Sequence, residues 1–291
     1  MRDRSIHEMK SPRFPIATKG ILIATAALFI VHYYFLNDEM QSMVTYFFSM
    51  RRDGLRSYFL WQPLTYMFLH GGLLHLIFNM LVVFVFGKEL ERILGPRRFL
   101  LLYLGSGIMG GLGWALLSGT GYCIGASGGA MGLLGMYAAL FPNRPITLLL
   151  LFIFPVTLRA RTLALIFAVG SFVLTFWGSR VWGGNVAHSA HLVGLLAGAG
   201  YGYQLLHRAR RGRDGHLKRS LGDVVGGALR MARGRPHLKM ERGGLWESES
   251  EPEATPERID QILDKILARG VGSLNAEERR VLERASADLN D

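Results

Sequence analysis

The chain has 291 residues, and half of them are hydrophobic while only 19% are charged. Soluble domains carry roughly a quarter charged residues, so this composition excludes a disordered or collagen-like chain and favours a membrane protein. The single cysteine, Cys123, excludes an internal disulfide and a cysteine-based metal cage, and the net charge of +11 is concentrated in short segments.

Six apolar runs predict membrane helices, because a spanning helix needs about 17–25 mostly apolar residues. The runs cover residues 20–36, 73–87, 99–118, 128–142, 162–178 and 186–206. The second run reaches spanning length if the polar turn through Leu94 is included, and the fourth is short, so its start is expected inside the membrane. The stretch Ile146–Pro155 is too short to span and is interpreted as an interfacial or re-entrant connection. The predicted fold class is all-α, a polytopic six-helix bundle.

The basic residues that flank these runs predict the orientation of the chain. With six spans, four basic groups fall on one side: those before the first run, between the second and third, between the fourth and fifth, and after the sixth. This arrangement predicts that both termini are cytoplasmic. Arg51, Arg52 and Arg56 fall on the other side, in a long first loop. The first run is too long for a signal peptide, and no small-residue cleavage site follows it.

The charge pattern divides the chain into four predicted segments. They are a cytoplasmic segment at 1–19, the membrane domain at 20–206, a basic and then acidic linker at 207–254, and a helical module at 255–291. Residues 206–243 hold 11 basic and 3 acidic residues directly after a membrane helix. Attraction to anionic lipid and topology anchoring are therefore preferred to nucleic-acid binding, for which no fold-level motif is present.

The C-terminal module is predicted to contain two short helices. Thr255-Pro256 provides a cap and a first-turn proline, and Asn275-x-x-Glu278 resembles a capping box. Apolar residues repeat at helical spacing after the proline. A helical hairpin that packs on itself is the simpler interpretation, and contact with a partner or a second copy is the alternative.

Polar side chains inside a membrane are costly and are functional candidates by default. The first such group is His70, His75 and Asn79, at the start of the second run. His75 and Asn79 are four residues apart and share one helix face, whereas His70 precedes the helix. For each residue alone, the simpler interpretation is an interfacial histidine or an asparagine that joins two helices.

The second group surrounds Ser127, in Gly125-Ala126-Ser127-Gly128-Gly129 at the start of the fourth run. The pattern matches the Gly-x-Ser-x-Gly nucleophile elbow, but that motif follows a strand, and the neighbours here are membrane helices. A serine at a helix start is usually only a cap. The backbone N–H groups beside it and the helix dipole could also stabilise an oxyanion.

The third group begins at His191 in the sixth run. Gly194 and Gly198 follow with the Gly-x-x-x-Gly spacing that permits close helix contact, and Gly128 and Gly132 repeat it on the fourth run. If the two glycine faces meet, the histidine comes near the serine at similar depth. A neutral imidazole could then accept the serine proton.

Together these motifs resemble the rhomboid family of intramembrane serine proteases. The resemblance covers about residues 20–206. It rests on His70…His75…Asn79, Gly125-Ala126-Ser127-Gly128 and His191-x-x-Gly194-x-x-x-Gly198 in that order, and Trp61-Gln62 and Glu91-Arg92 also resemble family positions.

The resemblance implies that Ser127 is the nucleophile and His191 the general base of a Ser–His dyad. The Ser127 backbone N–H, His75 and Asn79 would line the oxyanion hole, and each donor would contribute about 3 kcal/mol to transition-state stabilisation. His70 would belong to the supporting polar network. The four glycines at 128, 132, 194 and 198 would pack the two helices together.

The resemblance also implies that the substrates are single-pass transmembrane proteins in a bacterial inner membrane. Membrane lipids are the other expected partners, and no metal or organic cofactor is implied. The helix at 162–178 and the loop Ser179–Val186 would form a lateral gate and cap. Two positions depart from the family pattern: Gln62 replaces a loop-anchoring arginine, and Met131 replaces an aromatic that often stacks on the catalytic histidine.

Two alternatives stay open. A catalytically inactive relative would act in binding or quality control, although such relatives lack the serine, the histidine or both. A metal transporter could use His70, His75, His188 and His191, since histidines bind zinc and copper well. The transporter hypothesis leaves the serine motif unexplained and predicts activity that a chelator abolishes, whereas serine-directed inhibition favours the protease.

Overall fold

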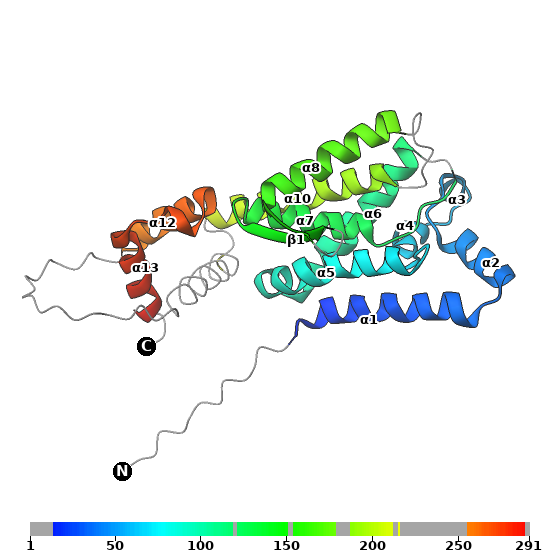
Figure 1. Ribbon diagram of the computed structural model, residues 1–291, viewed down its shortest axis with the longest axis horizontal. Coiled ribbons are helices and arrows are strands. Elements are labelled where there is room, and N and C mark those ends of the chain that lie inside the picture. The colour runs from blue at the N-terminus through cyan, green and yellow to red at the C-terminus, as the bar shows by residue number, and fades with distance from the viewer. Residues whose placement is uncertain are drawn as a thin grey trace, which may run out of the picture.

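The computed structural model describes residues 14–118, 121–150, 154–178, 187–211, 215 and 255–288. In this part of the chain each of the six apolar runs forms a helix. The six are α1 (Ile16–Ile30) with the π-helical turn η1 (Val31–Phe35), α5 (Leu73–Leu94), α6 (Pro96–Leu117), α7 (Ser127–Leu140), α8 (Ala160–Val173) with the π-helical turn η3 (Leu174–Gly178), and α10 (His188–Arg210). They form one bundle (Figure 1), which confirms the predicted all-α class.

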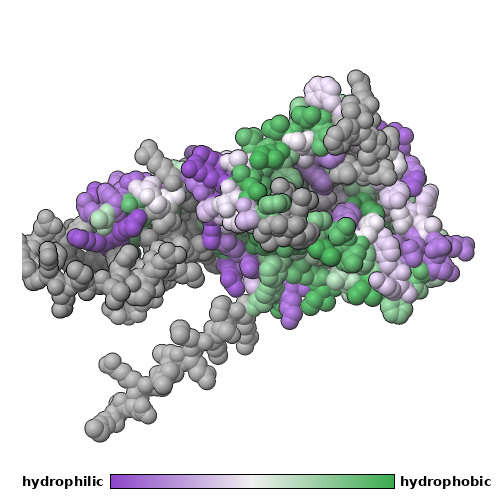
Figure 2. Space-filling view, viewed as in Figure 1, coloured by the Kyte–Doolittle hydropathy of each residue, from purple (hydrophilic) through white to green (hydrophobic). Residues whose placement is uncertain are grey.

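Four helices in the described ranges are long and apolar enough to cross a membrane. They are Ile16–Phe35, Leu73–Leu94, Pro96–Leu117 and Ala160–Trp177. The second extends through the polar turn to Leu94, as the sequence suggested. α7 is apolar but has only 14 residues, and α10 has 23 residues and ends in a basic turn. Figure 2 shows hydrophobic side chains gathered over the bundle, with hydrophilic ones toward its ends.

α7 is the centre of the bundle. Twelve of its 14 residues are buried, and it is rich in glycine because α6 and α10 approach its backbone closely. Burial of this kind allows a short helix to occupy the core of the membrane domain without facing lipid.

The beginning of α1 is held by a buried carboxylate from α5. Glu91 accepts hydrogen bonds from the Ala17 N–H at 2.9 Å, and from the Thr18 N–H and hydroxyl at 2.7 Å each. A carboxylate at a helix N-terminus satisfies unpaired N–H groups and complements the helix dipole. α1 therefore begins at Ile16, four residues before the predicted run.

The long first loop contains three short helices and a 3₁₀ turn: α2 (Asp38–Phe48), α3 (Arg52–Arg56), α4 (Gln62–Thr65) and η2 (Tyr66–Phe68). These elements lie at the end of the bundle opposite the beginning of α1 (Figure 1). The Gln62 side chain is fully buried. Its amide accepts from the Arg51 N–H at 3.2 Å and donates to the carbonyls of Tyr46 and Phe47. The loop is thus anchored by an amide, although the family arginine is absent.

The stretch predicted as an interfacial or re-entrant connection is an antiparallel hairpin. Strands β1 (Pro145–Leu150) and β2 (Phe154–Arg159) pair with Pro145 opposite Arg159. The hydroxyls of Thr147 and Thr157 face each other across the pair at 2.9 Å. An apolar run of this length fits a strand as well as a helix, and its β-branched residues favour the strand.

The C-terminal module contains α12 (Pro256–Arg269), the 3₁₀ turn η4 (Val271–Ser273) and α13 (Ala276–Asp288). The predicted capping box is present: Asn275 and Glu278 exchange two backbone-to-side-chain hydrogen bonds of 2.8 Å. The two helices bury a small apolar cluster of their own, which contains Ile262, Ile266, Leu274, Val281 and Leu282. The predicted cap, Ser179–Val186, and most of the segments predicted at 1–19 and 207–254 lie outside the described residues.

Candidate active site

Ser127 is the first residue of α7, and it is partly exposed while the next residues of the helix are buried. Two residues earlier, Gly125 has φ +123°, a conformation that favours glycine. A Cβ at this position would lie 2.6 Å from His75 Nε2. The backbone at Gly125 therefore packs directly against the His75 ring, and the Cβ of any other residue would clash with that ring.

His75 and Asn79 come from the first turns of α5. The Asn79 amide donates to the His75 carbonyl at 2.8 Å, and its Nδ2 lies 3.8 Å from the Cβ position of Gly125. The rings of His70 and His75 are 5.0 Å apart. Both predicted oxyanion side chains therefore face the short segment that leads into Ser127.

The segment before Ser127 is fixed by backbone contacts to the first loop. Met50 and Cys123 exchange two hydrogen bonds of 2.9 Å, and the Gly125 N–H donates to the Tyr66 carbonyl at 2.9 Å. The Ala126 N–H donates to His70 Nε2 at 3.4 Å. Burial raises the pKa of Cys123 to about 12, so this thiol stays protonated and serves to fill space.

α7 and α10 meet at the two glycine pairs. A Cβ at Gly194 would contact the carbonyl group of Gly128, and a Cβ at Gly198 would contact that of Gly132. On α6, a Cβ at Gly110 would lie 2.8 Å from the Ala190 carbonyl oxygen and 3.3 Å from the Gly128 Cα. The residues adjacent to Ser127 and to His191 thus converge on one point of α6.

His191 lies in the first turn of α10 and is partly buried. Its ring is 6.1 Å from that of His188, and it is within electrostatic range of His75. In the part of the chain that the structure describes, no hydrogen bond joins Ser127 to His191. Catalytic hydrogen bonds are often long without substrate and shorten when the substrate binds.

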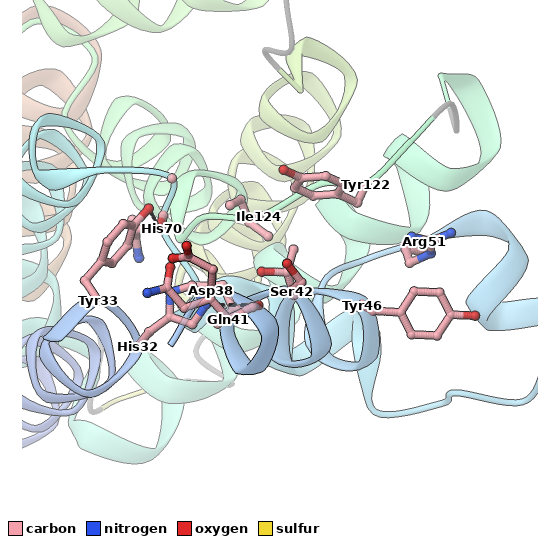
Figure 3. Close-up of a pocket in the computed structure, with 13 residues that line it drawn as sticks. His32, Tyr33, Asp38, Gln41, Ser42, Tyr46, Arg51, His70, Tyr122 and Ile124 are labelled. Atoms are coloured by element: carbon pink, nitrogen blue, oxygen red, sulfur yellow. Dashed lines mark hydrogen bonds between the residues drawn. The ribbon is translucent and has the colours of Figure 1, made fainter. Parts of the chain in front are cut away.

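A polar pocket of about 540 Å³ lies on the first-loop side of this site. Figure 3 shows His70 and Tyr33 on one side of it and Arg51 and Tyr46 on the other, with Tyr122 between them. The Tyr33 hydroxyl donates to the His70 carbonyl at 3.1 Å. His70 therefore lines the pocket and also contacts the backbone that leads to Ser127.

Tyr66 belongs to the surroundings of the site but was not predicted from the sequence. Its hydroxyl donates to the Gly107 carbonyl at 2.6 Å and lies 2.8 Å from the Cβ position of Gly128. A second missed contact joins the hydroxyls of Ser118 and Ser189 at 2.8 Å, between α6 and α10. No local sequence motif marks either contact, because each one joins residues more than 40 positions apart in the chain.

Among the described residues, no group of three or more His, Cys, Asp or Glu side chains is arranged to hold a metal ion. The histidines of this region instead pair at ring distances of 5.0 and 6.1 Å.

Comparison with known proteins identifies two families. Residues 58–208 match the rhomboid domain, and residues 252–288 match a family of unknown function, DUF6576. The first match covers every predicted catalytic and oxyanion residue, and the second covers α12 and α13.

Several rhomboid proteins are similar to this chain. The putative rhomboid protease YdcA of Bacillus subtilis is 39% identical over 113 residues, 34% of this chain and 57% of that protein. The mitochondrial rhomboid protein 1 of Saccharomyces cerevisiae is 34% identical over 165 residues, 52% of this chain and 43% of that protein. The rhomboid protease GluP of Bacillus subtilis is 35% identical over 140 residues, 47% of this chain and 24% of that protein.

The chain therefore matches little more than half of the length of any of these three relatives. The matched domain nevertheless fills just over half of the chain and contains α5 to α10, which carry the polar residues described above. Together with the four helices of spanning length, this match shows that the chain belongs to the rhomboid family of integral membrane proteins.

Proposed function

We propose that this chain is an intramembrane serine endopeptidase that hydrolyses peptide bonds of transmembrane proteins. The observation that carries the proposal is the convergence of Gly128 and Ala190 on Gly110. Because these residues adjoin Ser127 and His191, the proposed nucleophile and base lie on neighbouring helices at similar depth. The relatives named as rhomboid proteases add support at the level of the family.

The proposed reaction proceeds in two steps. Ser127 Oγ attacks the carbonyl carbon of the scissile bond while His191 accepts the serine proton, and the peptide nitrogen leaves with that proton. Water then attacks the acyl-enzyme and loses a proton to His191, which passes that proton to the departing Ser127 Oγ, so the carboxylic acid product leaves and both residues return to their starting state. The Ser127 N–H, His75 and Asn79 would stabilise the negative oxygen, each with a contribution of about 3 kcal/mol.

The polar pocket beside His70 is consistent with entry of the hydrolytic water from the side of the first loop. Its lining includes the side chains of Asp38, Gln41 and Ser42, and water occupies polar cavities of this size readily. His70 would act as a supporting residue between this pocket and the oxyanion site.

The proposed substrates are single-pass transmembrane proteins, and the proposed location is a bacterial inner membrane with both termini cytoplasmic. α1 begins and α10 ends at the same end of the bundle (Figure 1), which an even number of crossings requires. The first loop and the Ser127 end of α7 would then face the outer side.

The test is cleavage of a fluorescently tagged single-pass substrate in liposomes, with a fluorophosphonate probe for the serine. Wild type should cleave and label, and Ser127→Ala should do neither. His191→Ala should lose cleavage and most labelling. Ser118→Ala and His188→Ala are matched controls near the site and should retain labelling.

Labelling that persists in Ser127→Ala would contradict the nucleophile. Labelling and cleavage that are both absent from folded wild-type protein would favour an inactive relative that binds its clients. Activity that a chelator abolishes and the serine probe leaves unchanged would favour the transporter hypothesis.

A further inference from the structure

We propose that α12 and α13 form a docking module whose receptor is the turn between α7 and β1 of the same chain. This assigns an interaction surface to the segment that matches a family of unknown function. The inference is independent of the proposed protease activity, because it concerns the end of α7 opposite Ser127.

The contact between the two parts centres on Asn143. Its side-chain amide donates to the Ala268 carbonyl at 2.6 Å, across 125 positions of the chain. Ala268 lies in the last turn of α12, where backbone carbonyls have no helical partner. Asn143 therefore supplies a donor that the end of α12 requires.

The glycine that ends α12 lies near the same side chain. Gly270 has φ +84°, which allows the chain to turn away from the helix at once. Its Cβ position lies 3.6 Å from Asn143 Cβ, an ordinary van der Waals distance. The end of α12 thus meets the turn through a hydrogen bond, and Gly270 lies beside the Asn143 side chain with room for a Cβ between them.

The receptor turn is held in shape by backbone hydrogen bonds that do not involve the module. The Arg144 N–H donates to the Phe141 carbonyl at 3.1 Å, and the Ala160 N–H donates to the Arg144 carbonyl at 2.9 Å. The Arg161 N–H donates to the Pro142 carbonyl at 3.0 Å. A preformed receptor loses little conformational entropy when the module binds.

The charges at this contact are complementary. The C-terminal end of a helix carries a partial negative charge, which favours nearby cations. The receptor turn contains Arg144, and the exposed Arg161 is bonded to the turn through its backbone N–H. The exposed Arg159 pairs with Pro145, the residue that follows the turn. Attraction between these cations and the negative end of the helix would orient the module with the end of α12, rather than its beginning, toward the membrane domain.

The turn also connects two of the helices that carry the candidate site. The Arg144 guanidinium is bonded to the Glu89 carboxylate of α5, and the Tyr137 hydroxyl of α7 donates to the same carboxylate at 3.1 Å. The module therefore docks where the ends of α5 and α7 are joined. α5 carries His75 and Asn79 at its other end, and α7 carries Ser127.

The module buries its apolar cluster internally, so its contact with the turn is small and polar. A contact of this kind can be released by a competing partner without unfolding either part. The occupant of the turn is α12 of the same molecule, and a second copy is the alternative outcome of the test.

Disulfide crosslinking tests the docking directly. Asn143→Cys and Gly270→Cys are combined with Cys123→Ala in the full-length protein in native membranes. The Cβ separation of 3.6 Å lies inside the range of about 3.5–4.5 Å that disulfides adopt. Oxidation should link most molecules internally, and a protease site placed in the 216–254 linker should reveal the link, because the two fragments stay joined until reduction.

Thr147→Cys with Thr157→Cys is the positive control, because these residues already face each other in the hairpin. Each single cysteine variant is a negative control. Since Gly270→Cys is strained and Asn143→Cys removes the amide that donates to Ala268, a second pair, Pro142→Cys with Ser273→Cys, keeps both native residues and is bridged by a short bismaleimide. Disulfide-linked dimers would overturn docking within one chain. Failure of both pairs while the hairpin control is oxidised would overturn docking itself.

Discussion

The Tyr66 hydroxyl donates a 2.6 Å hydrogen bond to the Gly107 carbonyl, at the point where α6 passes the start of α7. The Tyr66 carbonyl in turn accepts from the Gly125 N–H. One residue of the first loop therefore holds both α6 and the segment that leads into Ser127. A role in positioning the site follows from these two contacts, because Tyr66 itself is fully buried and does not reach solvent.

Tyr66→Phe should destabilise the protein and slow cleavage. The substitution removes one of the donors to the buried Gly107 carbonyl, which keeps its bond within α6, and the loss of one such hydrogen bond costs about 0.5–1.5 kcal/mol. The thermal unfolding midpoint in detergent and the cleavage rate in liposomes measure the two effects. Tyr103→Phe is the matched control, because the Tyr103 hydroxyl is buried without a hydrogen-bond partner among the described residues. Equal losses in the two variants would contradict the role of Tyr66.

Gly125→Ala should abolish most activity while the fold persists. An alanine here is strained by about 1–2 kcal/mol because φ is positive, and its Cβ would also displace the His75 ring. Loss of one oxyanion donor lowers kcat by about 10²-fold or more, and this is the expected reduction. Gly121→Ala is the control: it also has a positive φ, +76°, but its Cβ would meet nothing within 4 Å. A similar rate loss at both positions would indicate strain alone.

The helices of the six apolar runs could be predicted from the sequence because each run is long enough to exclude a strand, whereas the short loop helices α2, α3 and α4 were not predicted. Ser127, His75 and His191 could be singled out because polar residues in such runs are costly. Tyr66 could not, since an aromatic residue in a loop is unremarkable until α6 and α7 are placed around it. The start of α1 depends in the same way on Glu91, which is 73 positions from Thr18.

The hairpin at 145–159 shows where hydropathy alone is insufficient. Its residues are as apolar as those of the helices, and the run around Leu148 has no period that separates strand from buried helix. The strands form because the two segments pair, with Thr147 opposite Thr157. Such pairing depends on both segments together and cannot be read from the hydropathy of either one. The contact between Asn143 and Ala268 could not be predicted for the same reason, because it joins two segments 125 positions apart.

Gln62→Leu should loosen the first loop. The substitution keeps the size of the side chain but leaves the Arg51 N–H and the Tyr46 carbonyl without their partner, while the Phe47 carbonyl keeps the Trp61 indole N–H. Unsatisfied buried groups cost about 1–3 kcal/mol, so limited proteolysis within residues 38–61 should accelerate. Gln41→Leu is the control, because the Gln41 amide donates only to the Leu36 carbonyl and is partly exposed. Equal proteolysis of the two variants would contradict the anchoring role of Gln62.

The pH dependence of stability should reveal His70. Burial and the neighbouring His75 lower the pKa of His70 to about 4, whereas a histidine in the unfolded chain has a pKa of about 6.5. Between pH 6.5 and pH 4 the unfolded state binds a proton at His70 that the folded state does not bind. The contribution of His70 to the free energy of unfolding is therefore complete above pH 6.5 and is lost as the pH falls. The loss is about 1.4 kcal/mol per pH unit, or about 2 kcal/mol at pH 5.

Thermal unfolding at pH 7.5 and pH 5 measures this effect. His70→Gln should reduce the difference between the two midpoints, because glutamine does not bind a proton in this range. His207→Gln, at an exposed position near the end of α10, should leave the wild-type difference unchanged. An undiminished difference in His70→Gln would mean that other groups carry the acid sensitivity, and that His70 reaches solvent through the pocket it lines.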